Sequence, residues 1–437
     1  MAMHEDDLKE VPMQQLVEAS DTGRSGQLST AQCCRACGGR LEAFVDLGLS
    51  PLCEGFLTGR ERDAALTFYP LNVRICTSCW LGQLPEFVAP AAIFTDYAYF
   101  SSFSDAWLAH ARDYAAAMVD RFGLDASSHV VEVASNDGYL LRNFVERRIP
   151  CLGIEPAANV ARAAEALGVP TLVEFFGRSL AMRLAREGRA ADLIAGNNVL
   201  AQVPDLNDFV AGLAALLKAE GVITLEFPHL LRLIQENQFD TIYHEHFSYF
   251  SLASVESLLA IHGLRVFDVE ELWTHGGSLR VFACRDASSR AECVGVREVR
   301  AGERAGGLLE LATYQAFQAR VEHTKHALLS LLIRLKGEGK RIVGYGAPGK
   351  GNTLLNYCGI RTDLLEFTVD RNPHKHGKFL PGTGIPILAP DAIERARPDY
   401  VLILPWNLRT EITRQLAHIR DWGGRFIVPI PEAEILG

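Results

Sequence analysis

Short apolar runs alternate with helical patterns through the middle of the chain. The apolar runs lie at residues 130–134, 152–154, 193–196 and 222–227, and helical patterns lie at 159–167 and 206–219, with another beginning at Tyr139. Regular alternation of strands and helices predicts a doubly wound α/β sheet. A second alternation has expected strands at 341–346, 365–370 and 400–404. We therefore expect two α/β domains.

Different patterns flank these two regions. Expected strands at 41–49 and 71–75 lie in a Cys-, Gly- and Arg-rich stretch, and an alanine-rich helix is expected at 106–122. One long helical stretch, 298–336, separates the two α/β regions. The expected parts are a tail over 1–30, a small ribbon-like domain over 31–88, an α/β domain with a helical connector over 89–297, and a C-terminal α/β domain over 298–437.

Composition narrows the class of protein. With 437 residues, 48% of them hydrophobic and 22% charged, the chain has the composition of a folded globular protein. The net charge of −10 disfavours a nucleic-acid partner. The longest apolar run, 209–217, is much shorter than the roughly 20 residues of a membrane span, so no membrane partner is expected. The first thirty residues lack the pattern of a signal peptide, which favours a cytoplasmic location.

Cysteines cluster near the N-terminus. Cys34-x-x-Cys37 and Cys76-x-x-Cys79 are two pairs that can each seat two thiolates on a tight turn. Together they predict a tetrahedral Zn²⁺ site without an open position, which would be structural. Because 38 residues separate the pairs, more than is usual, Cys33 or Cys53 are alternative ligands. Unpaired buried cysteines, or a nucleic-acid zinc ribbon that the acidic charge disfavours, are the other interpretations.

The turn after residues 130–134 has the features of a ligand site. A polar turn ends at Gly138 and opens a helix, whose N-terminal N–H groups can bind a carboxylate. Glu155 ends the next expected strand, where a carboxylate can hold both hydroxyls of a ribose. Asn197 and Asn198 end a further strand at the same edge. The turn has no G-x-G-x-x-G, which disfavours a nicotinamide cofactor there.

Glu132, Gly138 and Glu155 resemble the nucleoside-binding motifs of class I S-adenosylmethionine methyltransferases, with Ala134 where those motifs usually have a first glycine. The resemblance implies that S-adenosylmethionine is the cofactor. The cofactor-binding residues it implies are Glu132, Ser135, Asn136, Asp137, Gly138, Glu155, Asn197 and Asn198. A Rossmann-like sheet that binds a different nucleotide is the alternative.

Tyr243, His244, Glu245 and His246 stand in four consecutive positions. Such a run is unusual for a core strand or for a solvated face. Histidine can be neutral and basic near pH 7, and tyrosine can donate to a developing oxyanion. A His-x-His pair can also bind metal, but no third ligand with conventional spacing lies near. The run therefore indicates a catalytic site.

With this run the chain closely resembles the deoxysugar C-methyltransferases, which add a methyl group to a nucleotide-linked 4-keto sugar. The resemblance extends from Cys34 through nearly all of the chain. It implies that His246 is the general base, that Glu245 orients or assists it, and that Tyr243 contacts the sugar carbonyl or a hydroxyl. It adds Tyr97 as a further active-site tyrosine. A dTDP-linked 4-keto-6-deoxy sugar is the implied substrate, methylated at C3 or alternatively at C5.

The C-terminal α/β region carries its own glycine turn. Residues 344–349 match G-x-G-x-x-G and Asp370 ends a later strand, which by spacing alone suggests NAD. Pro348, Lys350 and the basic cluster after Asp370 argue against it. The family resemblance implies that this domain binds the substrate nucleotide, with Lys350 suited to its diphosphate. The expected substrate-binding residues are His244, His275, Arg280, Lys350, Asn352, Asp370 and Arg371. An NAD-dependent nucleotide-sugar enzyme is the alternative.

Overall fold

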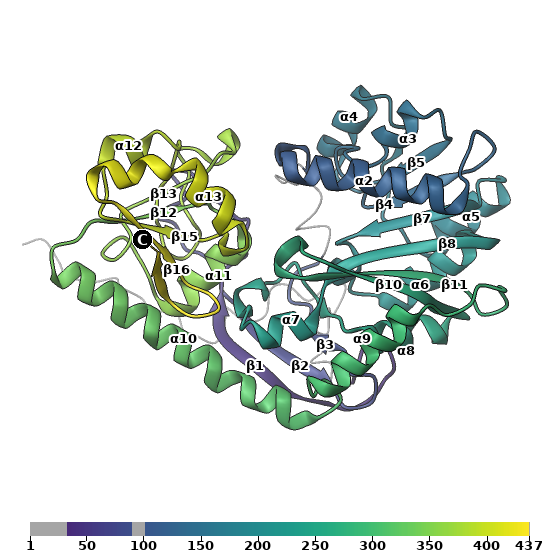
Figure 1. Ribbon diagram of the computed structural model, residues 1–437, viewed down its shortest axis with the longest axis horizontal. Helices are drawn as coiled ribbons and strands as arrows, with labels where there is room; N and C mark the ends of the chain where they lie inside the picture. The colour runs from purple at the N-terminus through teal and green to yellow at the C-terminus, as the bar shows by residue number, and fades with distance from the viewer. Residues whose placement is uncertain (1–32, 90–100, 437) are drawn as a thin grey trace, which may run out of the picture.

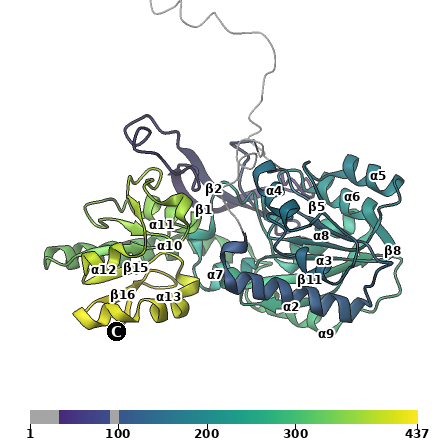
Figure 2. The same cartoon turned by 90° about the horizontal axis from the view of Figure 1, so that it is seen from above.

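The computed structural model describes residues 33–89 and 101–436, and it contains three sheets. A seven-stranded sheet and a six-stranded sheet, each covered by helices, form two separate lobes (Figure 1). The third sheet contains the N-terminal strands β1 (Leu41–Ser50) and β2 (Tyr69–Cys76), which lie between the two lobes in both views (Figures 1 and 2). Both predicted α/β regions are thus present.

The central sheet has the strand order β10-β11-β8-β7-β4-β5-β6. Its strands are β4 (Val130–Val133), β5 (Cys151–Ile154), β6 (Thr171–Leu172), β7 (Ala191–Asn197), β8 (Leu217–Pro228), β10 (Leu264–Leu272) and β11 (Ser278–Arg285). Strands β4 to β8 are parallel, whereas β11 runs antiparallel to both β8 and β10. This doubly wound sheet with one reversed strand confirms the predicted class I methyltransferase fold.

Helices cover both faces of the central sheet, and each face has its own hydrophobic cluster. One face carries α2 (Asp105–Phe122), α3 (Arg142–Glu146) and α4 (Ala158–Ala166); the other carries α5 (Arg178–Arg186), α6 (Leu206–Leu216), α8 (Leu252–Ile261) and α9 (Val294–Ala305). Helix α2 follows the predicted connector pattern because Ser104 caps its first turn and Gly123, at φ 63°, ends it. Short α7 (Leu230–Gln235) follows β8.

The N-terminal sheet is completed by a strand from the central part of the chain. Its order is β1-β2-β3-β9, where β3 is Gly82–Gln83 and β9 is Ser248–Tyr249. Strand β9 begins two residues after His246, so the Tyr243–His246 run leads directly into this sheet. On its other side, β1 packs on α10 (Leu311–Gly337), where Phe44 contacts the rings of Tyr314 and Phe317.

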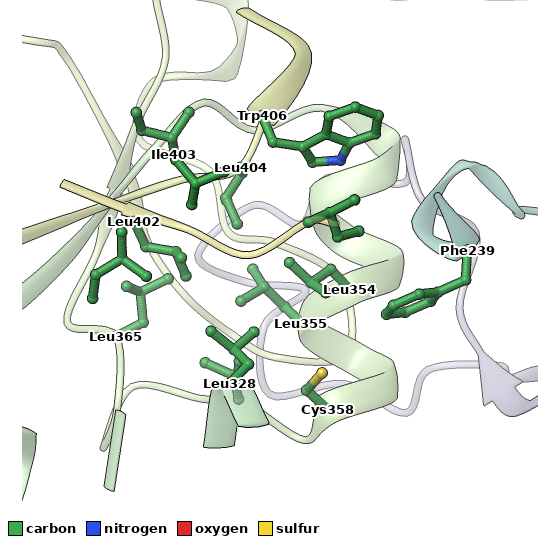
Figure 3. Close-up of a cluster of buried hydrophobic side chains, with 14 of the residues drawn as sticks. Phe239, Leu328, Leu354, Leu355, Cys358, Leu365, Leu402, Ile403, Leu404 and Trp406 are labelled. Carbon is green, nitrogen blue, oxygen red and sulfur yellow. The ribbon is translucent and has the colours of Figure 1, made fainter. Parts of the chain in front are cut away.

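The C-terminal sheet has the order β14-β13-β12-β15-β16-β17 and is parallel except for β17. Its strands are β12 (Ile342–Tyr345), β13 (Thr368–Val369), β14 (Ile387–Leu388), β15 (Tyr400–Ile403), β16 (Arg425–Val428) and β17 (Glu434–Leu436), and its helices are α11 (Gly349–Cys358), α12 (Ala392–Ala396) and α13 (Arg409–Gln415). Figure 3 shows α11 packed on this sheet, with Phe239 of the central region on its far side. Phe239 therefore anchors the segment before Tyr243 to this lobe.

Two expected helices have different bounds. The stretch predicted as one helix over 298–336 is divided into α9 and α10, because Gly307 takes a φ of 76° and a side chain at Gly306 would collide with Leu231. Helix α6 ends at Leu216, where β8 begins by pairing Leu217 with Ala191. Among the helices of the described ranges, not one is both long and apolar enough to cross a membrane.

Candidate active site

A cavity of about 680 Å³ lies between the central and C-terminal lobes. One wall comes from the carboxyl ends of the central strands and includes Asn136, Glu155, Asn197 and Asn198. The opposite wall comes from the C-terminal lobe and includes Tyr345, Lys350, Asp370, Arg371 and Asn407. Between the two walls, Tyr243, Glu245 and His246 form a floor. The cavity therefore unites residues that the sequence separates by more than two hundred positions.

His246 has the hydrogen bonding of a neutral base. Its Nδ1 lies 3.0 Å from the carbonyl oxygen of Thr241, and because a carbonyl only accepts, Nδ1 carries the proton. The Nε2 lone pair is then left for a ligand in the cavity. Burial lowers the pKa of His246 to about 4, so the ring is uncharged at pH 7. The ring packs against that of Tyr243, with 4.1 Å between centroids and 32° between the ring planes, which fixes its orientation.

Buried Glu245 and half-buried Tyr243 lie beside two residues of the N-terminal domain. Cys53 Sγ donates to Glu245 Oε1 at 3.4 Å. Burial, with repulsion from Glu54, raises the pKa of Glu245 to about 8, and burial also raises the pKa of Tyr243. Both groups are therefore protonated near pH 7 and can donate hydrogen bonds. Glu54 also lines the cavity, and no local sequence pattern indicates this, because only the fold brings its loop to the Tyr243–His246 run.

His275 enters the cavity from a strained turn between β10 and β11. It has a φ of 55°, and its Nε2 lies 3.2 Å from Asn198 Nδ2. The turn is held from below, where Thr274 donates to Glu226 at 3.0 Å. Arg280 is buried in that support, 3.0 Å from Glu226 and 2.9 Å from Glu270. Arg280 thus holds an ion-pair network under the turn and does not line the cavity, contrary to the expected substrate contact.

Two further predicted substrate residues lie away from the cavity. His244 is buried and its Nε2 lies 3.1 Å from the carbonyl oxygen of Pro70, on the side of the N-terminal sheet. Asn352 is buried inside α11. Neither lines the cavity. In a compact run such as 243–246, neighbouring side chains point in different directions, so adjacency in sequence did not identify which would face the ligand.

The predicted cofactor turn is fixed by acids that accept backbone N–H groups. Glu155 accepts from Asn136 N at 3.0 Å and from Ala157 N at 2.9 Å. Because each carboxylate oxygen has two lone pairs, Glu155 keeps acceptor capacity toward the cavity it lines. Asn197 Oδ1 is buried at the same edge and has no hydrogen-bond partner in the described part of the chain. Carboxylate and amide acceptors at this position fit the ribose and amino groups of S-adenosylmethionine.

The remaining predicted cofactor residues shape this turn from beneath. Asp137 Oδ2 accepts from Ser102 N at 3.0 Å, and Glu132 and Ser135 are fully buried. Gly138 has a φ of 77°, and a Cβ there would lie 3.1 Å from Ala164 in α4. Gly138 thus permits close packing of α4, and none of these four residues lines the cavity.

On the opposite wall, Asp370 likewise accepts hydrogen bonds from backbone N–H groups, one of them in the glycine turn. Ala347 N donates to Asp370 Oδ2 at 2.7 Å, and Asn372 N donates to Asp370 Oδ1 at 2.8 Å. Lys375 Nζ donates to Ala347 O at 2.9 Å and lies 3.5 Å from Glu54 Oε2. Asp370 therefore braces the turn, while Arg371 is exposed at the cavity, where it lies 3.8 Å from Glu411.

The four predicted zinc ligands come together in the N-terminal domain. Their sulfur atoms all lie within 4.8 Å of one another, and two of the S–S distances are 3.6 Å. Tetrahedral Zn–S bonds of about 2.3 Å would separate sulfurs by about 3.8 Å. Gln83 Nε2 donates to Cys34 Sγ at 3.2 Å, which suits a thiolate. Cys34, Cys37, Cys76 and Cys79 thus fit a structural zinc ion, whereas Cys33 lies outside this cluster and Cys53 donates to Glu245.

Tyr97, the last of the predicted site residues, lies outside the described residues.

Three family models match successive parts of the chain. They are described as a zinc binding domain (residues 34–94), a methyltransferase domain (107–269) and a C-methyltransferase C-terminal domain (273–431). Among curated proteins, the C-methyltransferase NovU of Streptomyces niveus is 39% identical over 405 residues, which cover 92% of this chain and 96% of NovU.

Solved structures also show similarity. One is the magnesium protoporphyrin IX methyltransferase of Synechocystis with bound S-adenosylhomocysteine, at 14% identity and a TM-score of 0.33 over 41% of this chain and 83% of that one. Another is an S-adenosylmethionine-dependent methyltransferase of Clostridium acetobutylicum, at 11% identity and a TM-score of 0.32 over 40% and 90% of the two chains. On the strength of the match to NovU and of the three family models, this chain belongs to the S-adenosylmethionine-dependent C-methyltransferases.

Proposed function

We propose that this protein methylates C3 of a dTDP-linked 4-keto-6-deoxy sugar through base-catalysed formation of an enolate. The observation that carries the proposal is the state of His246, a neutral imidazole whose Nδ1 proton is committed to Thr241 and whose Nε2 can face a substrate. A carbon becomes a nucleophile for methyl transfer when a base removes its proton and an adjacent ketone takes up the charge. The arrangement of His246 suits that base.

We assign the cofactor to the wall contributed by residues 89–297. Glu155 is suited to hold the ribose hydroxyls, and Asn197 and Asn198 are suited to polar groups of the same ligand, because these residues line one side of the cavity. When bound there, S-adenosylmethionine supplies an electrophilic methyl group. Ser135, Asn136 and Asp137 belong to the turn that shapes this wall, and the wall would place the methyl donor opposite the substrate.

In the proposed step, His246 Nε2 removes a proton from the carbon next to the ketone. The C–H electron pair forms the enolate double bond, and the carbonyl electron pair moves to the oxygen. A histidine whose pKa is lowered by burial is a weak base in isolation. Here, however, its positive charge would form beside the new negative charge of the enolate, which offsets the cost of burying each charge. Tyr243 and protonated Glu245 can donate to sugar oxygens. Each acid or base group of this kind contributes about 10²–10⁴-fold.

We assign the substrate nucleotide to the wall contributed by residues 298–437. Arg371 is the exposed cation at this side of the cavity and is suited to a diphosphate, while Asp370 would act by fixing the turn beside it. An acidic protein needs such a local cation to hold a dianionic ligand. His275, which lines the cavity next to Asn198, is suited to a hydroxyl or carbonyl of the sugar.

Incubation with S-adenosylmethionine and a panel of dTDP-linked 4-keto sugars tests the proposal. The expected product carries one additional methyl group, which NMR locates at C3, and the matched sugar without the C4 ketone is expected to give none. A new methyl at C5 would favour the alternative position. Failure to methylate any keto sugar by protein that binds S-adenosylmethionine would overturn the proposal. A parallel titration with NADH tests the alternative of a nicotinamide enzyme.

A further inference from the structure

Lys350 holds a half-buried ammonium group at the cavity. It is the second residue of α11, and its Nζ donates to Asn407 Oδ1 at 2.8 Å and lies 4.7 Å from the centre of the Trp406 ring. Within the described ranges, no carboxylate lies within 4.0 Å of this ammonium. An ammonium has three donors, and Asn407 satisfies one of them. The remaining donors are available to a ligand in the cavity that Lys350 lines.

The ring under Lys350 joins the two segments that carry the histidines. Trp406 Nε1 donates to Asp240 Oδ2 at 2.7 Å, three residues before Tyr243. The same ring packs on Gly276, where a Cβ would approach it to 2.7 Å, directly after His275. Figure 3 shows Trp406 beside the start of α11. The positive charge of Lys350 accordingly adds to the effect of burial in lowering the pKa values of both His246 and His275.

The place where a glycine turn normally binds phosphate is taken by a side chain of the protein. Glu54 and Cys53 lie against the start of α11, because a Cβ on Gly349 would lie 3.5 Å from Glu54 Oε1 and 2.9 Å from Cys53 Sγ. Asp370 uses the N–H of Ala347, as described above. A diphosphate at this helix N-terminus would meet carboxylates instead of free donors. The turn therefore gives no support for a diphosphate beside Lys350.

We propose, resting on the proposed function, that Lys350 is a catalytic residue whose ammonium contacts the ketone oxygen of the sugar and stabilises the enolate, and that it does not bind the diphosphate. In this step the C–H bond breaks and its proton goes to His246 Nε2. The carbonyl π electrons move to the oxygen beside Nζ. They return to re-form the ketone when the carbon–carbon bond to the methyl group forms and the methyl–sulfur bond of the donor breaks, which leaves that bond's electron pair on sulfur. Lys350 stays protonated throughout.

The test compares Lys350→Met with Arg371→Met, because each removes one cation from the same wall. The measurements are kcat, KM for the sugar nucleotide, and exchange of its acidic hydrogen with deuterated water in the presence of S-adenosylhomocysteine. Loss of one preorganised oxyanion donor typically costs about 10²–10³-fold. For Lys350→Met we expect kcat and the exchange rate to fall together by about 10²-fold with little change in KM. For Arg371→Met we expect KM to rise with kcat nearly kept.

Two further variants keep the test decisive. Asn407→Ala removes the acceptor that holds Nζ, and we expect a smaller loss of kcat and exchange with KM retained; this result alone would support the proposal if Lys350→Met does not fold. Lys350→Arg keeps the charge and is expected to recover part of the exchange rate. Raised KM with unchanged kcat and exchange in Lys350→Met would overturn the assignment and indicate a diphosphate contact. By contrast, failure of the unaltered protein to exchange or methylate any 4-keto sugar would contradict the proposed function itself.

Discussion

The two walls of the cavity are built on the same plan and differ in what their acids leave available. After β4, the turn over residues 134–138 has no G-x-G-x-x-G, yet Glu155 accepts two backbone N–H groups and still faces the cavity. After β12, the turn over 344–349 has the full glycine pattern, but Asp370 accepts the N–H of Ala347 and the Glu54 carboxylate lies against Gly349. The turn that lacks the pattern is therefore the one whose acid still lines the cavity.

The difference teaches that a glycine pattern specifies a backbone shape, and that the polar groups which still face the cavity decide the ligand. Ala134 and Asn136 take φ values of 58° and 49° in the first turn, so this turn reaches left-handed conformations without glycine. In the second turn, Gly346 has a φ of 88° and packs on Pro405. Its glycines therefore serve close packing within the protein.

The largest expected effect lies at the floor, between the walls. His246→Asn removes the base but keeps a side chain that can accept and donate hydrogen bonds. We expect kcat to fall about 10²–10⁴-fold, while the affinities for S-adenosylmethionine and for the sugar nucleotide stay nearly unchanged. Steady-state kinetics together with calorimetric titration of each ligand check this. Unchanged turnover would show that His246 is not the base and that a residue of one of the two walls removes the proton.

A paired substitution compares the walls directly. Glu155→Gln loses the charge that would hold the ribose hydroxyls, and we expect S-adenosylmethionine affinity to fall about tenfold, or ~1.4 kcal/mol. Asp370→Asn makes the matched change on the other wall and is expected to leave that affinity unchanged. Isothermal titration calorimetry measures both. Equal losses from the two variants would contradict the assignment of the cofactor to the central wall.

The sequence predicted features that depend on residues close together in the chain and missed contacts between residues far apart in it. Hydrophobic alternation located both sheets, and the two CxxC pairs located the thiol cluster, because each signal is local. The contact between Cys53 and Glu245 joins residues 192 positions apart, and no local pattern indicates it. Arg280 was expected at the substrate, but it forms an ion pair with buried Glu226, 54 positions earlier in the chain, which no local pattern indicates.

The N-terminal domain contacts both the C-terminal wall and the floor of the cavity. Its Glu54 lies 3.5 Å from Lys375, and its strand β3 pairs with β9, which follows the Tyr243–His246 run. Cys76→Ser is expected to release zinc and lower the melting temperature by about 5 °C or more. Metal analysis and calorimetry measure these changes. Cys33→Ser is the control, since Cys33 is exposed and outside the thiol cluster. A Cys76→Ser protein with full zinc content and an unchanged melting temperature would show that these thiols do not hold the metal.

The smallest expected effect is the pH dependence of kcat/KM, which reports whether water reaches His246 between the two walls. Burial lowers the pKa of His246 to about 4, so the base form persists as pH falls and is lost only as pH passes through about 4. An exposed histidine with a pKa near 6.5 would lose about tenfold in kcat/KM by pH 5.5. We expect kcat/KM to change less than about twofold between pH 7 and 5.5. Stability should fall over the same interval, because the unfolded chain binds a proton below about pH 6.5 that folded His246 does not bind. An inflection of kcat/KM near pH 6.5 would mean that His246 has the pKa of an exposed histidine, and hence that the two walls do not exclude water from it.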